Sequence, residues 1–216
     1  MELYSAPRVV EMSELENPRW RPQREAAARN EEKLLQTARH LLRSPDATQV
    51  DMREIAQVAG VGVGTLYRRF GDKAGLLAAV IGEEEHALQE KILQGPPPLG
   101  PGAADDERLL AFIDALVALT ERNIGALLVT EATPPGRLGV GAYGGWRQHL
   151  ALLLRGLRTD LDAVDAGWYA DTLLASMDAQ LYAFQRRTLK LSQRRIATNA
   201  KALALAIVGR PGSVGA

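Results

Sequence analysis

The sequence predicts an all-α protein with a small N-terminal three-helix domain and a larger C-terminal helical domain. Apolar residues recur at three- and four-residue spacings over most of the 216 residues, which is typical of helices that bury one face. No segment of useful length alternates apolar and polar residues as a half-buried strand does. The chain also contains no cysteine, which excludes a small disulfide-stapled fold and a thiolate metal site.

The N-terminal domain is expected over residues 22–71, after a charged, proline-containing arm over residues 1–21 that shows no periodicity. Its first helix is predicted over residues 23–43, because small and apolar side chains there fall on one stripe. Ser44 and Pro45 end this helix, since the residue before a proline disfavours helical geometry.

Two short helices follow, joined by a tight turn over residues 61–63. Asp51 has capping-box spacing with the glutamate three residues later, and Gly60 supplies a left-handed stop for the second helix. A third helix is expected over about residues 64–70 and is closed by Gly71. Two short helices around a glycine-containing turn form a helix-turn-helix, whose second helix enters the DNA major groove.

The third helix has a packing face and a polar face. At about 100° per residue, Leu66 and Phe70 share one face. The other face carries Thr65, Arg68 and Arg69. Arginine suits bidentate contacts to guanine, and threonine can reach a phosphate or a thymine methyl group. The alternative for both arginines is a solvated helix face.

Two neighbouring residues are candidates for phosphate contacts. Tyr67 projects sideways from the third helix, where its hydroxyl could meet a phosphate. Lys73 lies in the first turn of the next helix, where it opposes the helix dipole but joins the helix end in attracting a phosphate. The alternatives are a core position for Tyr67 and an ordinary surface position for Lys73.

The run from Asp51 to Lys73 contains I-A-x-x-A-G-V, G-T-L-Y-x-x-F and the final lysine. With Thr37 and Ala38, it resembles the DNA-binding domain of the tetracycline-repressor (TetR) family over roughly residues 30–80. The resemblance implies a DNA-binding domain on a helical ligand-binding and dimerisation body, usually in a repressor that a small molecule releases from its operator. By position, it implies DNA contacts for Arg53, Val63, Gly64, Thr65, Tyr67, Arg68, Arg69 and Lys73.

One residue departs from the family pattern. Gly62 stands where the family often has serine at the cap of the third helix. Without a side-chain oxygen, one capping bond must come from elsewhere, although glycine costs only a few tenths of a kcal/mol at such a position.

The rest of the chain is also predicted to be helical. A connecting helix is expected over residues 72–95, because three prolines follow it. The C-terminal domain over residues 96–216 contains a helix that starts near Asp105 and a glycine- and proline-rich loop over residues 132–145. Three further helical segments are expected, over about residues 146–160, 166–189 and 193–208. The last two are long and apolar enough to form a four-helix bundle between two subunits.

Aromatic and soft side chains of the C-terminal domain could line an apolar ligand pocket between helices. The candidates are Phe112, Tyr143, Trp146, His149 and Met177. Ordinary core packing is the alternative for each of them. Trp146 and His149 lie one helical step apart beside the glycine-rich loop, so both could meet a ligand at the pocket mouth.

Three other patterns have simpler explanations. Residues 139–144 match the letters of a dinucleotide fingerprint, but prolines stand where its required strand should end. Glu83 and His86 have the spacing of a di-iron half-site, but no second copy exists. Basic residues between Arg186 and Arg195 are expected in a solvated turn or in interface pairing with the acidic stretch over residues 83–131, and the alternative is a second phosphate contact. We therefore expect no metal, cofactor or enzyme activity.

Charge is balanced overall but unevenly distributed. The chain has 26 basic and 26 acidic residues, yet residues 83–140 carry ten acidic and four basic side chains. Residues 61–73 carry three basic residues against Asp72 alone. A small basic footprint beneath an acidic body predicts modest non-specific affinity for DNA.

These observations together predict a transcriptional regulator. The chain has neither a run of about 18 apolar residues nor, near its start, the pattern of a signal peptide, so we expect a cytoplasmic protein without a membrane segment. Its expected partners are a double-stranded DNA operator, a small-molecule effector and a second copy of the chain. The alternatives are a helical ligand-binding or enzymatic protein with a vestigial helix-turn-helix, and an activator.

Overall fold

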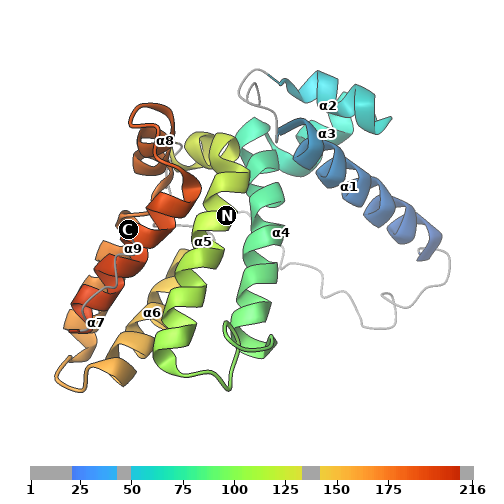
Figure 1. Ribbon diagram of the computed structural model, residues 1–216. Coiled ribbons are helices and arrows are strands. Elements are labelled where there is room, and N and C mark those ends of the chain that lie inside the picture. Colours follow the sequence, from blue (N-terminus) through green and yellow to red (C-terminus); the bar gives the residue numbers. More distant parts are fainter. Residues whose placement is uncertain (1–20, 43–49, 133–141, 210–216) are drawn as a thin grey trace, which may run out of the picture.

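The computed structural model describes residues 21–42, 50–132 and 142–209, and every regular element in these ranges is an α-helix (Figure 1). The predicted all-α class is confirmed. The predicted arm, apart from Arg21, and most of the glycine-rich loop lie outside the described residues. The helices are α1 (Arg21–Leu42), α2 (Met52–Ala59), α3 (Val63–Phe70), α4 (Lys73–Gln94), α5 (Asp105–Glu131), α6 (Tyr143–Leu157), α7 (Ala163–Ala175), α8 (Ala179–Arg187) and α9 (Gln193–Ile207).

Helices α1, α2 and α3 gather around the first half of α4 at one end of the molecule (Figure 1). Asp51 caps α2 by accepting hydrogen bonds from the backbone N–H groups of Arg53 and Glu54, at 2.7 and 2.8 Å. Gly60 ends α2 in the left-handed region at φ 69°. Leu66 of α3 is fully buried in the shared core. Local capping therefore fixes the turn between α2 and α3, as the sequence predicts.

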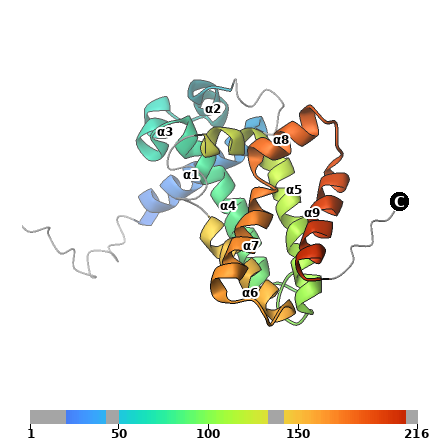
Figure 2. The same cartoon turned by 90° about the vertical axis from the view of Figure 1, so that its left-hand side faces the viewer.

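The C-terminal domain is built around α5, which packs against α4, α6, α8 and α9. Helices α6 and α7 lie side by side as a hairpin (Figure 2). The far end of α5 also reaches the N-terminal domain, because Ala126 is buried in that domain's core and Leu127 and Val129 pack against it. The two domains therefore share a continuous contact through α4 and α5.

The single helix predicted over residues 166–189 is wrong, because the chain breaks between α7 and α8. Asp178 caps α8 by accepting a hydrogen bond from the N–H of Leu181 at 2.8 Å. The Glu131 carboxylate accepts the N–H of Ala179 at 3.1 Å. The Ser176 hydroxyl donates to the Leu173 carbonyl at 2.7 Å, at the end of α7. These polar bonds satisfy the backbone groups that the break exposes. The helix expected over residues 146–160 is α6, shifted three residues toward the N-terminus.

The basic stretch after α8 has two kinds of residue. Arg186 forms a two-pronged ion pair with Glu121 of α5, with nitrogen–oxygen distances of 2.7 and 2.9 Å. These bonds, helped by the Tyr182 hydroxyl, lower the pKa of the Glu121 carboxyl. The remaining basic residues, Arg187, Lys190, Arg194 and Arg195, are exposed. Arg186 therefore pairs with the acidic stretch inside its own chain, and interface pairing by the other basic residues stays a prediction.

Candidate nucleic-acid interface and ligand pocket

Helix α3 lies on the surface of the N-terminal domain and buries one residue, Leu66. The predicted contact residues on this helix are all exposed, namely Val63, Gly64, Thr65, Tyr67, Arg68 and Arg69. Arg53 of α2 is exposed too. Tyr67 is 49% exposed, so the alternative of a core position does not hold for it. The structure therefore brings the predicted residues of α2 and α3 onto the surface of a single small domain.

The first turn of α3 has no side-chain cap, as Gly62 predicts. The N–H of Thr65 instead bonds to the Gly62 carbonyl at 2.9 Å. A Cβ atom added at Gly62 would meet only the Thr65 hydroxyl oxygen, at 3.9 Å. A serine would therefore fit at this cap without displacing any neighbour.

The two arginines of α3 differ in their surroundings, which the sequence could not show. Arg69 pairs with Glu31 of α1 through both carboxylate oxygens, with its Nε 3.1 Å from one of them. Arg68 makes no hydrogen bond or ion pair with any described residue. Arg69 thus ties α3 to α1, whereas Arg68 is available to an external partner. Base recognition by either arginine stays a prediction.

Lys73 is the first residue of α4 and is partly buried. Burial lowers the pKa of its ammonium group, and the nearby Asp51 carboxylate acts in the opposite direction. Asp51 caps α2, so Lys73 lies close to the start of that helix. This position beside the helix-turn-helix suits a phosphate contact, which also stays a prediction.

Gly64 is an exposed glycine inside a helix, and the fold does not explain it. A Cβ atom there would meet nothing within 4 Å, and the backbone is not left-handed. Glycine destabilises a helix by about 0.5–1 kcal/mol relative to alanine. A glycine in this place is typical of a surface that another backbone approaches closely.

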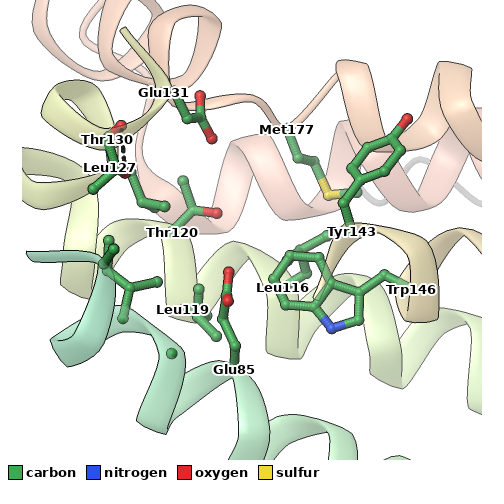
Figure 3. Close-up of a pocket in the computed structure, with 13 residues that line it drawn as sticks. Glu85, Leu116, Leu119, Thr120, Leu127, Thr130, Glu131, Tyr143, Trp146 and Met177 are labelled. Carbon is green, nitrogen blue, oxygen red and sulfur yellow. Dashed lines mark hydrogen bonds between the residues drawn. The ribbon is translucent and has the colours of Figure 1, made fainter. Parts of the chain in front are cut away.

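A cavity of about 160 Å³ lies between α4, α5 and α6 and extends to the turn after α7 (Figure 3). Three of the predicted ligand residues, Tyr143, Trp146 and Met177, line it. The sequence missed most of its wall, which comes from Ala78, Ile81, Gly82, Glu85, Leu116, Leu119, Thr120, Leu127, Thr130 and Glu131. Which faces of α4 and α5 meet is decided by packing, and no local pattern signals it.

Phe112 and His149, the other predicted ligand residues, do not line this cavity. Phe112 is fully buried, and the His149 ring packs edge-on against it with ring centroids 5.3 Å apart. Burial, together with the nearby Arg108, lowers the pKa of His149 to about 4. Core packing, the alternative for these two residues, describes their positions.

The cavity and the N-terminal domain share side chains. Ile81 of α4 is buried in the N-terminal core and also lines the cavity. Leu127 of α5 packs against the same core and lines the cavity too. Any molecule that fills the cavity would therefore touch residues that hold the helix-turn-helix in place.

Residues 34–80 match the family described as "Bacterial regulatory proteins, tetR family". This range spans most of α1, all of α2 and α3, and the start of α4. The chain carries a tetR-family DNA-binding domain. The predicted family is confirmed for the tetR-type helix-turn-helix, and the reading role of the exposed face of α3 stays a prediction.

Solved structures of regulators share this fold over most of the chain. A transcriptional regulator from Rhodococcus sp. RHA1 matches 83% of this chain and 96% of its own, with a TM-score of 0.63 and 20% identity. The fatty acid degradation regulator FadR from Bacillus halodurans matches 83% and 95%, with a TM-score of 0.59 and 17% identity. SmeT, in a complex with triclosan, matches 87% and 97%, with a TM-score of 0.59 and 16% identity. No curated protein matches the chain.

The described residues lack two kinds of site. Over residues 21–42, 50–132 and 142–209, no group of three or more histidine, cysteine, aspartate or glutamate side chains is placed to hold a metal ion. No helix in the same ranges has the length and apolar character needed to cross a membrane.

Proposed function

We propose that the protein is a cytoplasmic, homodimeric transcriptional repressor that binds a roughly palindromic operator through α3 and is released when a small molecule fills the cavity. One observation carries the proposal. The helix-turn-helix exposes every residue of α3 except Leu66 and the partly buried Phe70, and its core shares Ile81 and Leu127 with the cavity. The core beneath the helix-turn-helix and the proposed ligand cavity therefore share the same two residues of α4 and α5.

On DNA, we assign base contacts, phosphate contacts and the positioning of α3 to different residues. Arg68, which has no partner among the described residues, would contact base edges in the major groove. Tyr67 and Lys73 would contact phosphates and fix the register of α3 without reading sequence. Arg69 would act mainly by holding α3 against α1 through Glu31.

Release would be a shift between two populations of the dimer. A ligand favours whichever state it binds more tightly, so it can act only through groups that differ between the states. Ile81 and Leu127 supply such groups, because a ligand in the cavity packs against both. Lys73 begins α4 directly after α3, so a tilt of α4 would move the reading helix. Two reading helices must lie about 34 Å apart, or a multiple of this, to fit successive major grooves.

The dimer would form through the last helices. Large apolar side chains remain exposed on α7, α8 and α9, including Trp168 at 63% and Phe184 at 49%. Leu181 and Leu203 on α8 and α9 are exposed as well. Clustered apolar surface of this kind marks interfaces in proteins that are otherwise polar outside. Each subunit would supply α7 and α8 as two separate helices, in place of the single predicted helix over residues 166–189.

The experiment is selection of bound DNA from a random pool, followed by fluorescence anisotropy on the enriched sequence. We expect a two-fold symmetric site, and Arg68→Ala should weaken binding to it by about 1–3 kcal/mol and relax one base preference. The control is Arg155→Ala, an exposed arginine on α6, outside the proposed dimer helices. No enriched site, or equal losses for both variants, would overturn the proposal. DNA-independent turnover would instead support the enzymatic alternative.

A further inference from the structure

The segment that joins α8 to α9 carries a dense cluster of positive charge. Residues 187–195 contain four basic residues, and residues 179–209 contain no acidic residue. All four basic side chains are exposed, and we call them the basic turn: Arg187, Lys190, Arg194 and Arg195. None of the four side chains forms an ion pair with a described residue. Each subunit therefore presents four unpaired cations in one short stretch of its described surface.

Acidic residues of the neighbouring helix α5 already have other partners. Glu121 pairs with Arg186, with a nitrogen–oxygen distance of 2.7 Å. Asp114 pairs with Lys201 of α9, at 2.9 Å. Both carboxylates through which α5 pairs with α8 and α9 are therefore held by cations outside the basic turn.

Hydrogen bonds give the backbone of the basic turn a defined shape. Arg186 donates through Nη1 to the Leu191 carbonyl, at 2.7 Å. The Ser192 hydroxyl caps α9 by accepting the N–H of Arg195, at 3.1 Å. Lys190 lies between these two bonds at φ 56°, in the left-handed region that non-glycine residues seldom adopt. The cations therefore project from a braced segment.

The helix ends explain one of these cations and leave two without a stabilising role. Arg187 lies in the last turn of α8, where a cation interacts favourably with the helix dipole. Arg194 and Arg195 lie in the first turn of α9, which contains no acidic residue. Cations at a helix start oppose the dipole. The two arginines of α9 therefore do not stabilise the helix that carries them.

The basic turn lies at the same end of the molecule as the helix-turn-helix. Figures 1 and 2 both show the segment between α8 and α9 at the end that carries α2 and α3, whereas α4 and α6 finish at the opposite end. In the proposed dimer, α8 and α9 lie at the interface, so both basic turns would lie between the two reading helices. Two clusters of like charge repel each other, and a polyanion placed against both removes the repulsion.

We propose that the basic turn contacts the phosphate backbone of DNA at the centre of the operator, between the two half-sites. The inference rests on the proposed function for the dimer and for its DNA target. Phosphate contacts carry no sequence information, so the basic turn would add affinity without adding base preference. Its four cations also add to the three basic residues over residues 61–73, which makes binding more sensitive to salt than the helix-turn-helix alone would.

The test measures DNA affinity of the full chain by fluorescence anisotropy over a salt series from about 0.05 to 0.2 M. The variant combines Arg194→Gln with Arg195→Gln. The slope of log affinity against log salt should fall by about 1.8 per dimer if each subunit loses one phosphate contact, and by about 3.6 if each loses two. Affinities for the operator and for a shuffled duplex of equal length should fall by the same factor.

The matched control combines Lys91→Gln with Arg155→Gln and removes the same charge. Both residues are exposed and lie in the last turns of α4 and α6, which finish at the opposite end of the molecule (Figure 1). This control should leave the slope and both affinities unchanged. The melting temperature of the Arg194 and Arg195 variant should not fall, because glutamine removes cations that oppose the dipole of α9.

A second variant and modified DNA locate the contact. Arg187→Gln combined with Lys190→Gln should lower the salt slope in the same way without altering the start of α9. Uncharged methylphosphonate linkages at the operator centre should weaken the unmodified chain by about tenfold and either variant by less than twofold, because both changes remove the same contacts. The same linkages beneath the reading helices should weaken all three proteins alike.

Three outcomes would overturn the inference. They are salt slopes of both variants equal to that of the control, equal effects of the central linkages on the unmodified chain and the variants, and loss of the dimer in light scattering. The last result would support interface pairing instead. An operator bound with unchanged slopes keeps the proposed function and rejects the inference. If no operator is selected, the proposed function fails, and the salt series on the shuffled duplex still decides whether the basic turn contacts phosphates.

Discussion

Replacing Gly64 with alanine should stabilise the protein and weaken its binding to DNA. The two effects have opposite signs because they arise from different states of the chain. Gly64 lies inside α3 with a helical backbone and an empty surround, so alanine fits without strain. Nothing in the described residues accounts for glycine at this position, so we expect its reason to lie in the DNA-bound state.

The size of each effect follows from the structure. Alanine is better than glycine inside a helix by about 0.5–1 kcal/mol, and Gly64 is only the second residue of α3, so the lower figure applies. For a chain of this length, about 0.5 kcal/mol raises the melting temperature by about 1–2 °C. If the α3 backbone touches DNA at this point, an added methyl group overpacks the contact and costs about 1–3 kcal/mol of binding free energy.

Calorimetric melting and fluorescence anisotropy on the selected operator measure the two effects. Gly144→Ala is the matched control, because Gly144 is also an exposed glycine near a helix start with nothing within 4 Å of an added Cβ. It should melt at a slightly higher temperature and bind DNA as the unmodified chain does. Unchanged DNA affinity in Gly64→Ala would refute the close approach of DNA to α3, and a lower melting temperature would refute the backbone argument.

Three further variants test other parts of the molecule. Glu31→Gln should lower operator affinity by up to about tenfold, because Arg69 loses the carboxylate that holds α3 against α1, while stability changes by less than about 1 kcal/mol at this largely exposed pair; an unchanged or higher affinity would show that the pair does not position α3. Phe184→Glu should give a monomer in light scattering, because it places a charge in the proposed interface; a persistent dimer would contradict that assignment. His149→Phe should reduce the loss of unfolding free energy that the protein shows as the pH falls. The pKa of His149 is about 4 when folded and about 6.5 when unfolded, so only the unfolded state gains the proton between these values, and up to about 3 kcal/mol is lost as the pH falls through this window. Equal pH slopes of the two proteins in urea titrations would contradict this assignment.

The N-terminal domain could be predicted closely from the sequence because local signals bound its helices. Asp51 and Gly60 act within their own turns, so their effect does not depend on distant residues. The break before α8 was missed because Asp178 and its neighbours interrupt a stretch whose apolar periodicity continues on both sides. One of the hydrogen bonds that stabilise the break also comes from a residue distant in the sequence, because Glu131 lies 48 residues before Ala179.

The difference between local signals and contacts with distant residues also explains what the sequence missed on the surface of α3 and in the cavity. Exposure of Arg68 follows from the helical period of α3 alone, but the pairing of Arg69 depends on Glu31, which lies 38 residues away. Aromatic residues of the cavity could be proposed from their type, whereas Glu85 and Thr120 look like ordinary residues of an amphipathic helix. Their place in the cavity wall depends on the approach of α4 to α5, which is a property of the packed molecule.

The route from cavity to DNA is short, which limits how the two sites can be coupled. Ile81 lies eight residues into α4, so about 12 Å of helix separates it from Lys73 and the end of α3. Arg39 of α1 also pairs with Glu83 beside it, which links α1 to this part of α4. We therefore expect a ligand that displaces Ile81 to move the N-terminal domain with α4. Changes at Ile81 or Leu127 would alter domain stability and ligand response together, whereas Thr120 lies outside the N-terminal core and can report the ligand response alone.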